Sequence, residues 1–357
     1  MVLLSVTMND GVIPRSEIEG KDNSSADKSN YKVVLMGDMV YNSMRMWQGA
    51  NGISPYDGIV SPAYTVLMPK IPISNGYFAA LFKSPNLINE FRKNSQGMTS
   101  DTWNLMYPQI ETIKVHIPPL SEQNRVADML GTLERRIAKQ AQLVENLKKY
   151  KRGVVRTLLT PYSCCIADAT WTTAKIGDLG SFTKGAPLSK ADIAPDGTPF
   201  ILYGELYTTY HEVINAVIRR TQAQPEKQYY SRVGDVVIPT SGETPEEIST
   251  AACVMLPDII LAGDLNIFRS SKIDGRIMSY ILNHIVNGQI ARIAQGKSVV
   301  HIQASELSKI EISYPDYNTQ RKMFKIFDAL NTRTEIAQKK LMALRCMQKA
   351  LLQQLFM

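Results

Sequence analysis

The chain repeats its own pattern after 197 residues. The landmarks that recur at this offset are Pro118, Gln123, Leu133, Arg136 and Leu147, which return as Pro315, Gln320, Leu330, Arg333 and Leu344. Farther upstream, GDMV at 37–40 returns as GDVV at 234–237. A duplication of this size predicts two similar units. With 357 residues in all, each unit is long enough to bury a core of its own.

Each repeat has two parts. The first part mixes short β-rich runs with turn residues and short helical stretches, which is typical of an α/β or α+β domain. The second part is a long helix that follows a proline, with Ser121 and Asn318 as the predicted N-caps. The predicted organisation is therefore a first α/β domain at 1–117, a first long helix at 118–160, a second α/β domain at 161–315 and a second long helix at 316–357.

Apolar residues in both helices follow a 3-4 spacing, which predicts a coiled coil. A helix from Ser121 to Leu159 would be roughly 58 Å long at 1.5 Å per residue. The natural partner of each helix is the other one, paired antiparallel, with Gln140 and Lys151 as polar positions in the seam. The alternative is that each helix packs on its own domain. The predicted seam residues are Leu130, Leu133, Ile137, Leu147, Leu158, Phe327, Leu330, Leu341, Leu344 and Leu355.

The net charge of +7 is concentrated in the helices. Residues 121–159 carry nine Lys/Arg against four Asp/Glu, and residues 318–357 carry eight against two, so the rest of the chain is net negative. Basic helices suit nucleic acid, although a solvated helix face explains them equally well.

Several classes of protein are disfavoured by what the sequence lacks. The four cysteines and four histidines show no zinc-ligand spacing, so we expect no metal site. No run of about 18 apolar residues is present and the first residues do not form a signal peptide, so we expect a cytoplasmic protein without a membrane partner.

Four stretches carry a resemblance to a known family: IPPLSEQNRVADMLGTLERRI at 117–137, LVENLKKYKRGVVRTLL at 143–159, IGDLG at 176–180 after Trp171, and the block from 31 to 66. Together they resemble the specificity subunit of type I restriction–modification systems, over essentially the whole chain. The resemblance implies two target-recognition domains that each read one half of a split, asymmetric site in double-stranded DNA. It also implies paired helices that set the gap between the halves.

The same resemblance implies two methyltransferase subunits docked on the helices, with a restriction–translocase subunit as a further candidate partner. S-adenosylmethionine would belong to the methyltransferases, so no cofactor and no catalytic residue is expected in this chain. The sequence lacks a phosphate loop, an F-x-G-x-G loop and a [DN]-P-P-[YF] motif. Two alternatives remain: a methyltransferase with a fused recognition domain, and a coiled-coil scaffold that does not read DNA.

Polar loops mark the candidate DNA contacts, because Arg, Lys, Asn and Gln are the side chains that read base edges. In the first domain these are Asn42, Arg45, Gln48, Asn51, Tyr56, Gln96 and Thr99. In the second domain they are Lys184, Thr240, Ser241, Gln295, Lys297 and Ser298. The loops that follow the two GD turns are unrelated in sequence, so we expect two different half-sites. Helices of this length suit half-site centres about one to one and a half duplex turns apart.

The two domains differ at their start. In the second, 28 residues from Trp171 to Thr198 precede the strand PFIL, whose counterpart in the first is VLLSVT at 2–7. The first domain therefore lacks an opening region that the second possesses. Either the start is truncated or another chain completes the domain. We expect the first domain to fold nevertheless, because its later strands and its exit helix are intact.

Overall fold

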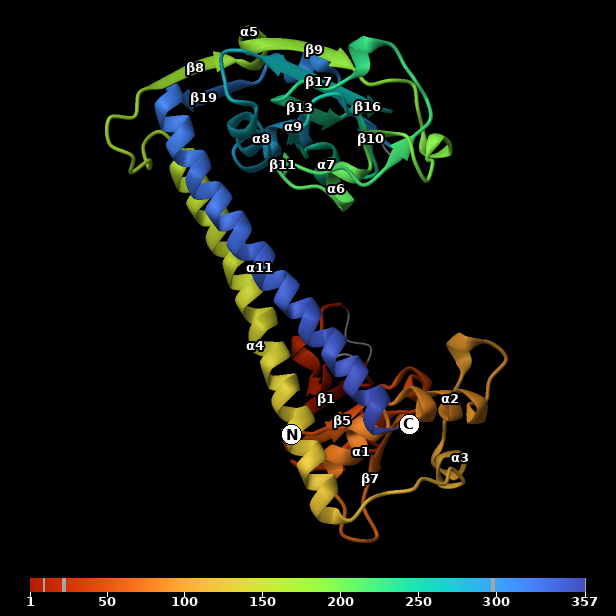
Figure 1. Ribbon diagram of the computed structural model, residues 1–357. Helices are drawn as coiled ribbons and strands as arrows, with labels where there is room; N and C mark the ends of the chain where they lie inside the picture. Colours follow the sequence, from red (N-terminus) through yellow and green to blue (C-terminus); the bar gives the residue numbers. More distant parts are fainter. Residues whose placement is uncertain (9, 21–23, 297–298, 357) are drawn as a thin grey trace. The chain divides into compact units, whose positions relative to one another are not determined.

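The computed structural model describes residues 1–8, 10–20, 24–296 and 299–356. The chain divides into two compact units, one formed by Met1–Leu143 together with Ala337–Met357 and one formed by Val144–Ile336. We call them the first and second unit. The predicted fold class is confirmed, because each unit holds mixed α/β structure and part of both long helices (Figure 1).

Among its described residues, the first unit contains two sheets. One has the order β2-β1-β6-β3 and the other has the order β5-β4-β7. The strands are β1 (Val2–Thr7), β2 (Gly11–Pro14), β3 (Lys32–Val34), β4 (Met39–Asn42), β5 (Asn51–Ile53), β6 (Gly58–Val60) and β7 (Tyr64–Leu67). The helices of this domain are α1 (Asn75–Leu81), α2 (Pro85–Asn94) and α3 (Tyr107–Glu111).

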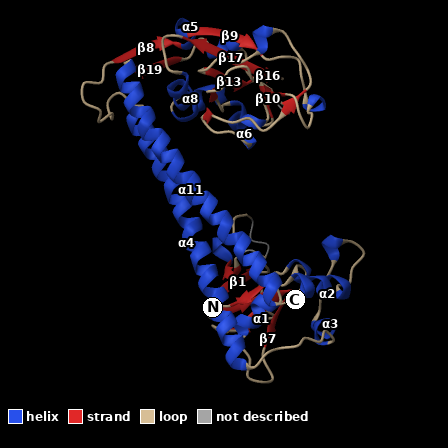
Figure 2. Cartoon of the chain, in the orientation of Figure 1, coloured by secondary structure: helices blue, strands red, loops and turns tan. Residues whose placement is uncertain are grey.

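The second unit is built on a five-stranded sheet with the order β11-β15-β13-β17-β9. Smaller sheets pair β12-β10-β16, β14-β18 and β19-β8, and α8 packs on β13 and β15 (Figure 2). The strands are β8 (Trp171–Lys175), β9 (Gly180–Lys184), β10 (Thr198–Leu202), β11 (Val213–Ile214), β12 (Arg220–Thr221), β13 (Asp235–Pro239), β14 (Ser241–Gly242), β15 (Ala252–Val254), β16 (Ile260–Ala262), β17 (Leu265–Ser270), β18 (Val300–His301) and β19 (Glu311–Pro315). The helices are α5 (Ile176–Leu179), α6 (Glu205–Thr208), α7 (Pro245–Ile248), α8 (Gly275–His284), α9 (Asn287–Ile293) and α10 (Ala304–Leu307).

Strand pairing shows that the two units are repeats. In both, a strand from the start of the domain pairs in parallel with a later one, β1 with β6 and β10 with β16. In both, a central strand lies antiparallel between two others: β4 between β5 and β7, and β13 between β15 and β17. Equivalent residues on β4 and β13, such as Met39 and Val236, are 197 positions apart.

The long helices α4 (Leu120–Leu158) and α11 (Tyr317–Leu355) have the same length of 39 residues. Both begin before the predicted caps. At α11 the cap is Asp316 rather than Asn318, because the Asp316 carboxylate accepts hydrogen bonds from the backbone N–H and the hydroxyl of Thr319. These bonds lower the pKa of Asp316 to about 2. Ser121 likewise lies inside the helix instead of capping it.

The proline–glutamine spacing ties each long helix to its own domain. Gln123 accepts a hydrogen bond from the backbone of Ser74 and donates one to the carbonyl of Pro118 at 2.8 Å. Gln320 accepts one from the backbone of Asp274 and donates one to the carbonyl of Pro315, also at 2.8 Å. Both glutamines are 2% exposed. A buried amide with both ends bonded fixes where the helix leaves the sheet.

The helices run antiparallel in both units, as predicted. In the first unit the Gln140 side chain donates to the carbonyl of Ala337 at 2.9 Å. In the second unit Val155 and Leu158 share a buried cluster with Met323 and Phe327. Later residues of α4 therefore face earlier residues of α11, which is the antiparallel order.

The predicted seam residues differ in how deeply they are buried. Leu130, Leu133, Leu158, Phe327 and Leu344 are buried, and Ile137, Leu147, Leu330 and Leu341 are half-buried. Leu355 is an exception at 37% exposed, because α11 ends at this residue. The neighbouring Phe356 is buried instead, at 8% exposed, against Tyr77.

Candidate nucleic-acid interface

The candidate surface of the first unit is built from two loops that meet at Ser43. One follows β4 and carries Arg45 and Gln48; the other follows α2 and carries Gln96 and Thr99. The backbone N–H of Leu105, which ends the second loop, donates to the carbonyl of Ser43 at 2.9 Å. The structure thus brings together two segments that the sequence analysis selected separately.

Arg45 is exposed at the start of the short helical turn Met46–Gln48, which the left-handed Gly49 closes with φ of 86°. Gln48 is half-buried in this turn. Gln96 and Thr99 are exposed, and the Gln96 backbone bridges Asn104. A guanidinium and an exposed amide on neighbouring loops can both reach base edges.

Asn51 and Tyr56 do not belong to this surface. Asn51 is fully buried and its amide donates to the carbonyl of Gly49, so it serves the turn rather than a ligand. Tyr56 is 40% exposed but lies in the turn after β5, two residues beyond Ser54, whose backbone N–H donates to the carbonyl of Asp38 at the opposite end of β4 from Ser43. Asn42 is half-buried, and its side-chain oxygen accepts the backbone N–H of Met44.

The sequence analysis missed an aromatic and basic group on the same loops. Trp47 and Trp103 meet edge to face with their ring centroids 5.2 Å apart, and the Arg92 guanidinium lies 5.8 Å from the Trp47 ring. Arg92 belongs to the last turn of α2, and α9 carries Arg292 in its last turn. The signal was an aromatic residue in each selected loop, beside basic side chains.

The second unit places its candidates at the equivalent position. The backbone N–H of Ile302 donates to the carbonyl of Thr240 at 3.0 Å, which repeats the bond between Leu105 and Ser43 at the same offset of 197. Gln295 is exposed and its backbone bridges His301. His301 itself is exposed on β18 and was not predicted. Lys297 and Ser298 lie outside the described residues.

Two predicted residues of the second unit are engaged within the fold. Ser241 is 4% exposed and its hydroxyl donates to the carboxylate of Asp264 at 2.7 Å, so it is a structural residue. The Lys184 ammonium donates to the side-chain oxygen of the fully buried Asn266 at 2.9 Å. Partial burial lowers the pKa of Lys184, while the charge of Asp264 opposes that effect. Thr240 is half-buried.

The described residues contain no cluster of His, Cys, Asp and Glu that could hold a metal ion. Among the same residues, no helix is both long enough and apolar enough to cross a membrane.

Comparison with known proteins gives a consistent picture. The family model described as type I restriction modification DNA specificity domain matches residues 5–149 and 169–345. The specificity subunit of type I restriction enzyme MjaVIII from Methanocaldococcus jannaschii is 22% identical over 319 residues, which cover 82% of this chain and 73% of that protein. The MjaX specificity subunit of the same organism is 19% identical, with 89% and 77% covered.

Solved structures show the same fold. The S subunit of a type I restriction–modification system from M. genitalium superimposes with a TM-score of 0.62 at 15% identity. A chain from a structure on the assembly and conformational transition of the type I system gives 0.60 at 16% identity. In both cases the match covers 99% of this chain and 90% of the other.

Proposed function

The chain belongs to the family of type I restriction–modification specificity subunits, which are non-catalytic, and from this premise we propose that it reads a bipartite, asymmetric site in double-stranded DNA. The observation that carries the proposal is the pair of equivalent surfaces. Each unit presents exposed polar side chains on two loops that an equivalent backbone hydrogen bond holds together. In the first unit the N–H of Leu105 donates to the carbonyl of Ser43, and in the second the N–H of Ile302 donates to the carbonyl of Thr240. The side chains on the two surfaces differ, so the half-sites they read should differ.

The first unit would use Arg45, Gln48, Gln96 and Thr99, with Arg92 as a phosphate contact. In the second unit Gln295 and His301 are the exposed candidates. Lys297 and Ser298 remain predictions from the sequence. Phosphate contacts provide most of the affinity and side chains at base edges provide the choice of sequence.

We further propose that α4 and α11 dock two methyltransferase subunits, which carry S-adenosylmethionine. Apolar side chains stand exposed on both helices despite their antiparallel pairing. Tyr150 is 60% exposed on α4, and Ile336 and Met342 are 62% and 66% exposed on α11. Exposed apolar side chains on a packed helix pair favour a protein partner.

The test is co-expression with methyltransferase subunits of type I systems, followed by mapping of methylated adenines on genomic DNA. We expect methylation within one split sequence whose two halves differ. A mobility shift with duplex DNA that contains this sequence should then require the specificity subunit, and should weaken as salt increases. The second candidate function is a coiled-coil scaffold without readout. It would be supported if the complex assembled and methylated without sequence preference.

A further inference from the structure

The second unit holds a cavity of about 420 Å³ where the C-terminal end of α4 meets the α/β domain. All the residues that line it belong to this unit. Its walls are formed by α4, by residues 206–212, by residues 250–251 and by residues 283–287. A cavity of this volume is large enough for a small molecule.

Two guanidinium groups of α4 line the cavity without a partner. Arg152 and Arg156 stand one helical turn apart, which places their Cβ atoms about 5–6 Å from each other. Both residues are exposed, and neither side chain forms a salt bridge or a hydrogen bond with a described residue. Like charges at this spacing destabilise a helix. The pair therefore costs stability unless an anion lies between the two groups.

The cavity supplies no free carboxylate for these arginines. Glu212 is the one carboxylate among the described residues that line it. Its two oxygens are already engaged, one by the Lys151 ammonium at 2.9 Å and the other by the His284 ring at 2.7 Å. Lys151 thus balances the charge of Glu212, and the positive charges of Arg152 and Arg156 remain in excess.

Negative charge acts on the opposite kind of wall, the one formed by α6. Tyr207 of α6 lines the cavity, and its pKa is raised by burial and then by the charges of Glu247 and Glu243. These two carboxylates do not line the cavity themselves. An anionic group should therefore bind at the α4 wall, and an uncharged part of the same ligand at the α6 wall.

Two further polar side chains of the lining are free to bind a ligand. His211 is exposed and Asn287 is half-buried, and neither side chain forms a hydrogen bond with a described residue. The neighbouring Asn283 is fully used, because its side chain accepts the N–H of Ala251 and donates to the carbonyls of Ala251 and Ser279. The wall that carries Asn287 is thus held in place before any ligand arrives.

The arginine pair is specific to the second unit. The helices α4 and α11 have equal length and correspond at the offset of 197, so Lys151 and Arg156 correspond to Gln348 and Gln353. Arg152 corresponds to Lys349. The first unit therefore lacks the pair, which is not a part of the scaffold that the two repeats share.

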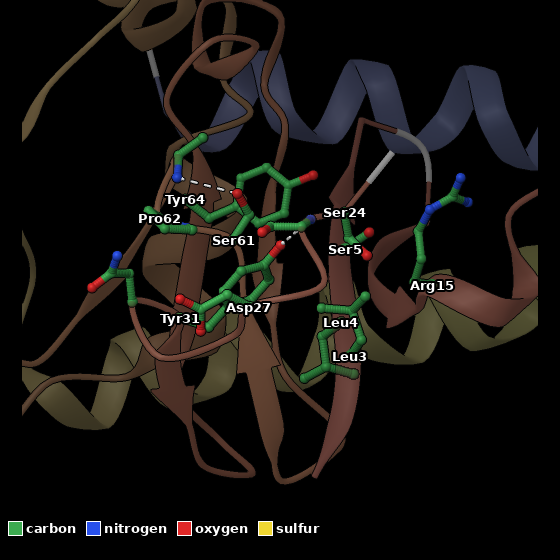
Figure 3. Close-up of a pocket in the computed structure, with 13 residues that line it drawn as sticks. Leu3, Leu4, Ser5, Arg15, Ser24, Asp27, Tyr31, Ser61, Pro62 and Tyr64 are labelled. Atoms are coloured by element: carbon green, nitrogen blue, oxygen red, sulfur yellow. Dashed lines mark hydrogen bonds between the residues drawn. The ribbon is translucent and has the colours of Figure 1, made fainter. Parts of the chain in front are cut away.

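A larger cavity in the first unit, of about 670 Å³, has a different character (Figure 3). Its charged lining residues among those described are Arg15 and Asp27. The Arg15 guanidinium donates to the carbonyl of Ile18, and the Asp27 carboxylate accepts the backbone N–H of Ser29. One positive and one negative group, each engaged within the fold, do not favour an anion.

We propose that the cavity of the second unit binds the diphosphate group of a small molecule, such as a nucleoside diphosphate or triphosphate. Arg152 and Arg156 would each contact one of two adjacent phosphoryl groups, because a guanidinium binds phosphate oxygens through two parallel hydrogen bonds. His211 and Asn287 would donate to the remaining oxygens, and the nucleoside would lie along Tyr207. This inference does not depend on the proposed reading of DNA.

The experiment titrates the full chain with inorganic pyrophosphate, ADP and orthophosphate by isothermal calorimetry, without divalent cations. We expect saturable binding of pyrophosphate and ADP. Orthophosphate should bind at least about tenfold more weakly, because a single phosphoryl group cannot engage both guanidinium groups. Hydrogen–deuterium exchange of the unmodified chain locates the site, and ADP should slow exchange at 206–212 and 283–287.

The variants Arg152→Gln and Arg156→Gln should each weaken the binding of pyrophosphate at least about tenfold. Neither should lower the melting temperature without ligand, because each relieves the repulsion between the two charges. The matched control is Lys349→Gln, which removes a positive charge at the position of α11 that corresponds to Arg152. This variant should leave the affinity for pyrophosphate unchanged.

Four results would overturn the proposal. The first is the absence of saturable binding by both pyrophosphate and ADP, and the second is equal affinity for orthophosphate and pyrophosphate. The third is exchange at 206–212 and 283–287 that ADP leaves unchanged. The fourth is a loss of affinity for duplex DNA in Arg152→Gln and Arg156→Gln with unaltered binding of pyrophosphate, which would assign the two arginines to the DNA backbone.

Discussion

Glu212 is a buried charge on which the stability of the second unit should depend. Its side chain is 10% exposed and accepts a hydrogen bond from the Lys151 ammonium of α4 at 2.9 Å. Its other oxygen lies 2.7 Å from the ring nitrogen Nε2 of His284 on α8. Replacing it with glutamine in the variant Glu212→Gln keeps the shape of the side chain and removes the negative charge.

The magnitude follows from the pKa of Glu212. Burial alone would raise it, but the hydrogen bond from His284 and the charge of Lys151 outweigh burial and lower it from 4.5 to about 2. Each pH unit of lowering corresponds to about 1.4 kcal/mol, so the carboxylate contributes about 3 kcal/mol to the free energy of unfolding at neutral pH. Because the folded pKa is the lower one, this stability is complete above about pH 4.5 and is lost as the pH falls through about 2. At pH 3 about half of it should remain.

The assay is urea unfolding followed by the fluorescence of Trp171, with Trp47 and Trp103 replaced by phenylalanine so that only the second unit is observed. Glu212→Gln should lower the free energy of unfolding by about 3 kcal/mol at pH 7 and by about half as much at pH 3. The matched control is Glu145→Gln, which removes an exposed ion pair with Lys148 on α4 and should cost less than about 0.5 kcal/mol.

The reasoning is refuted if Glu212→Gln costs less than about 1 kcal/mol at pH 7, or if its cost is the same at both pH values. Either result would mean that Lys151 and His284 do not stabilise the carboxylate beyond what water provides.

Three other perturbations test the remaining structure. Arg45→Ala should change which half-site is preferred, by about 1–3 kcal/mol of binding free energy for the affected base pair, whereas Lys149→Ala should weaken binding to all sequences alike or only disturb subunit docking. Competition binding with half-site libraries measures both effects. An equal loss of affinity across every half-site for Arg45→Ala would exclude a role of this residue in readout. Gln320→Ala should destabilise the second unit by about 2–3 kcal/mol, because it leaves the Asp274 N–H and the Pro315 carbonyl unpaired. Urea unfolding measures the change, and a loss of unfolding free energy under about 0.5 kcal/mol would contradict the prediction. One heptad inserted into the middle of both α4 and α11 should lengthen the tolerated gap between half-sites by about 10 Å; methylation mapping would show a change in gap with both half-sites retained, and an unchanged gap would count against the helices as spacers.

The repeat and the helix pair could be predicted from the sequence because their signals are local and periodic. Heptad spacing gives the apolar stripe directly, and the buried glutamines Gln123 and Gln320 recur at a fixed distance from a proline. The prediction that Leu355 lies in the helix seam was wrong. The periodicity of apolar residues carries no information about where α11 ends, and it is Phe356 that turns inward instead.

The candidate contacts were harder to predict, because the direction of a loop side chain depends on strand register. Asn51 and Arg45 stand only six positions apart in the same predicted loop, yet Asn51 is fully buried and Arg45 is exposed. Ser241 is buried, and its hydroxyl donates a hydrogen bond to Asp264, which lies twenty-three positions later in the sequence. The contact between Trp47 and Trp103 likewise joins residues that are distant in the chain, so only the folded structure reveals it.

The first unit is closed by residues that lie 270 positions later in the sequence than the helix they pack against. Phe356 packs against Tyr77, and its carbonyl accepts a hydrogen bond from the side chain of Asn86. During synthesis the first unit must therefore wait until the residues up to Phe356 have left the ribosome before its interior is sealed. The second unit needs nothing made after Ile336 and can mature first. The unit whose synthesis begins first is thus the one completed last, and a ribosome that stalls before Phe356 would release a chain in which the first unit is unfinished.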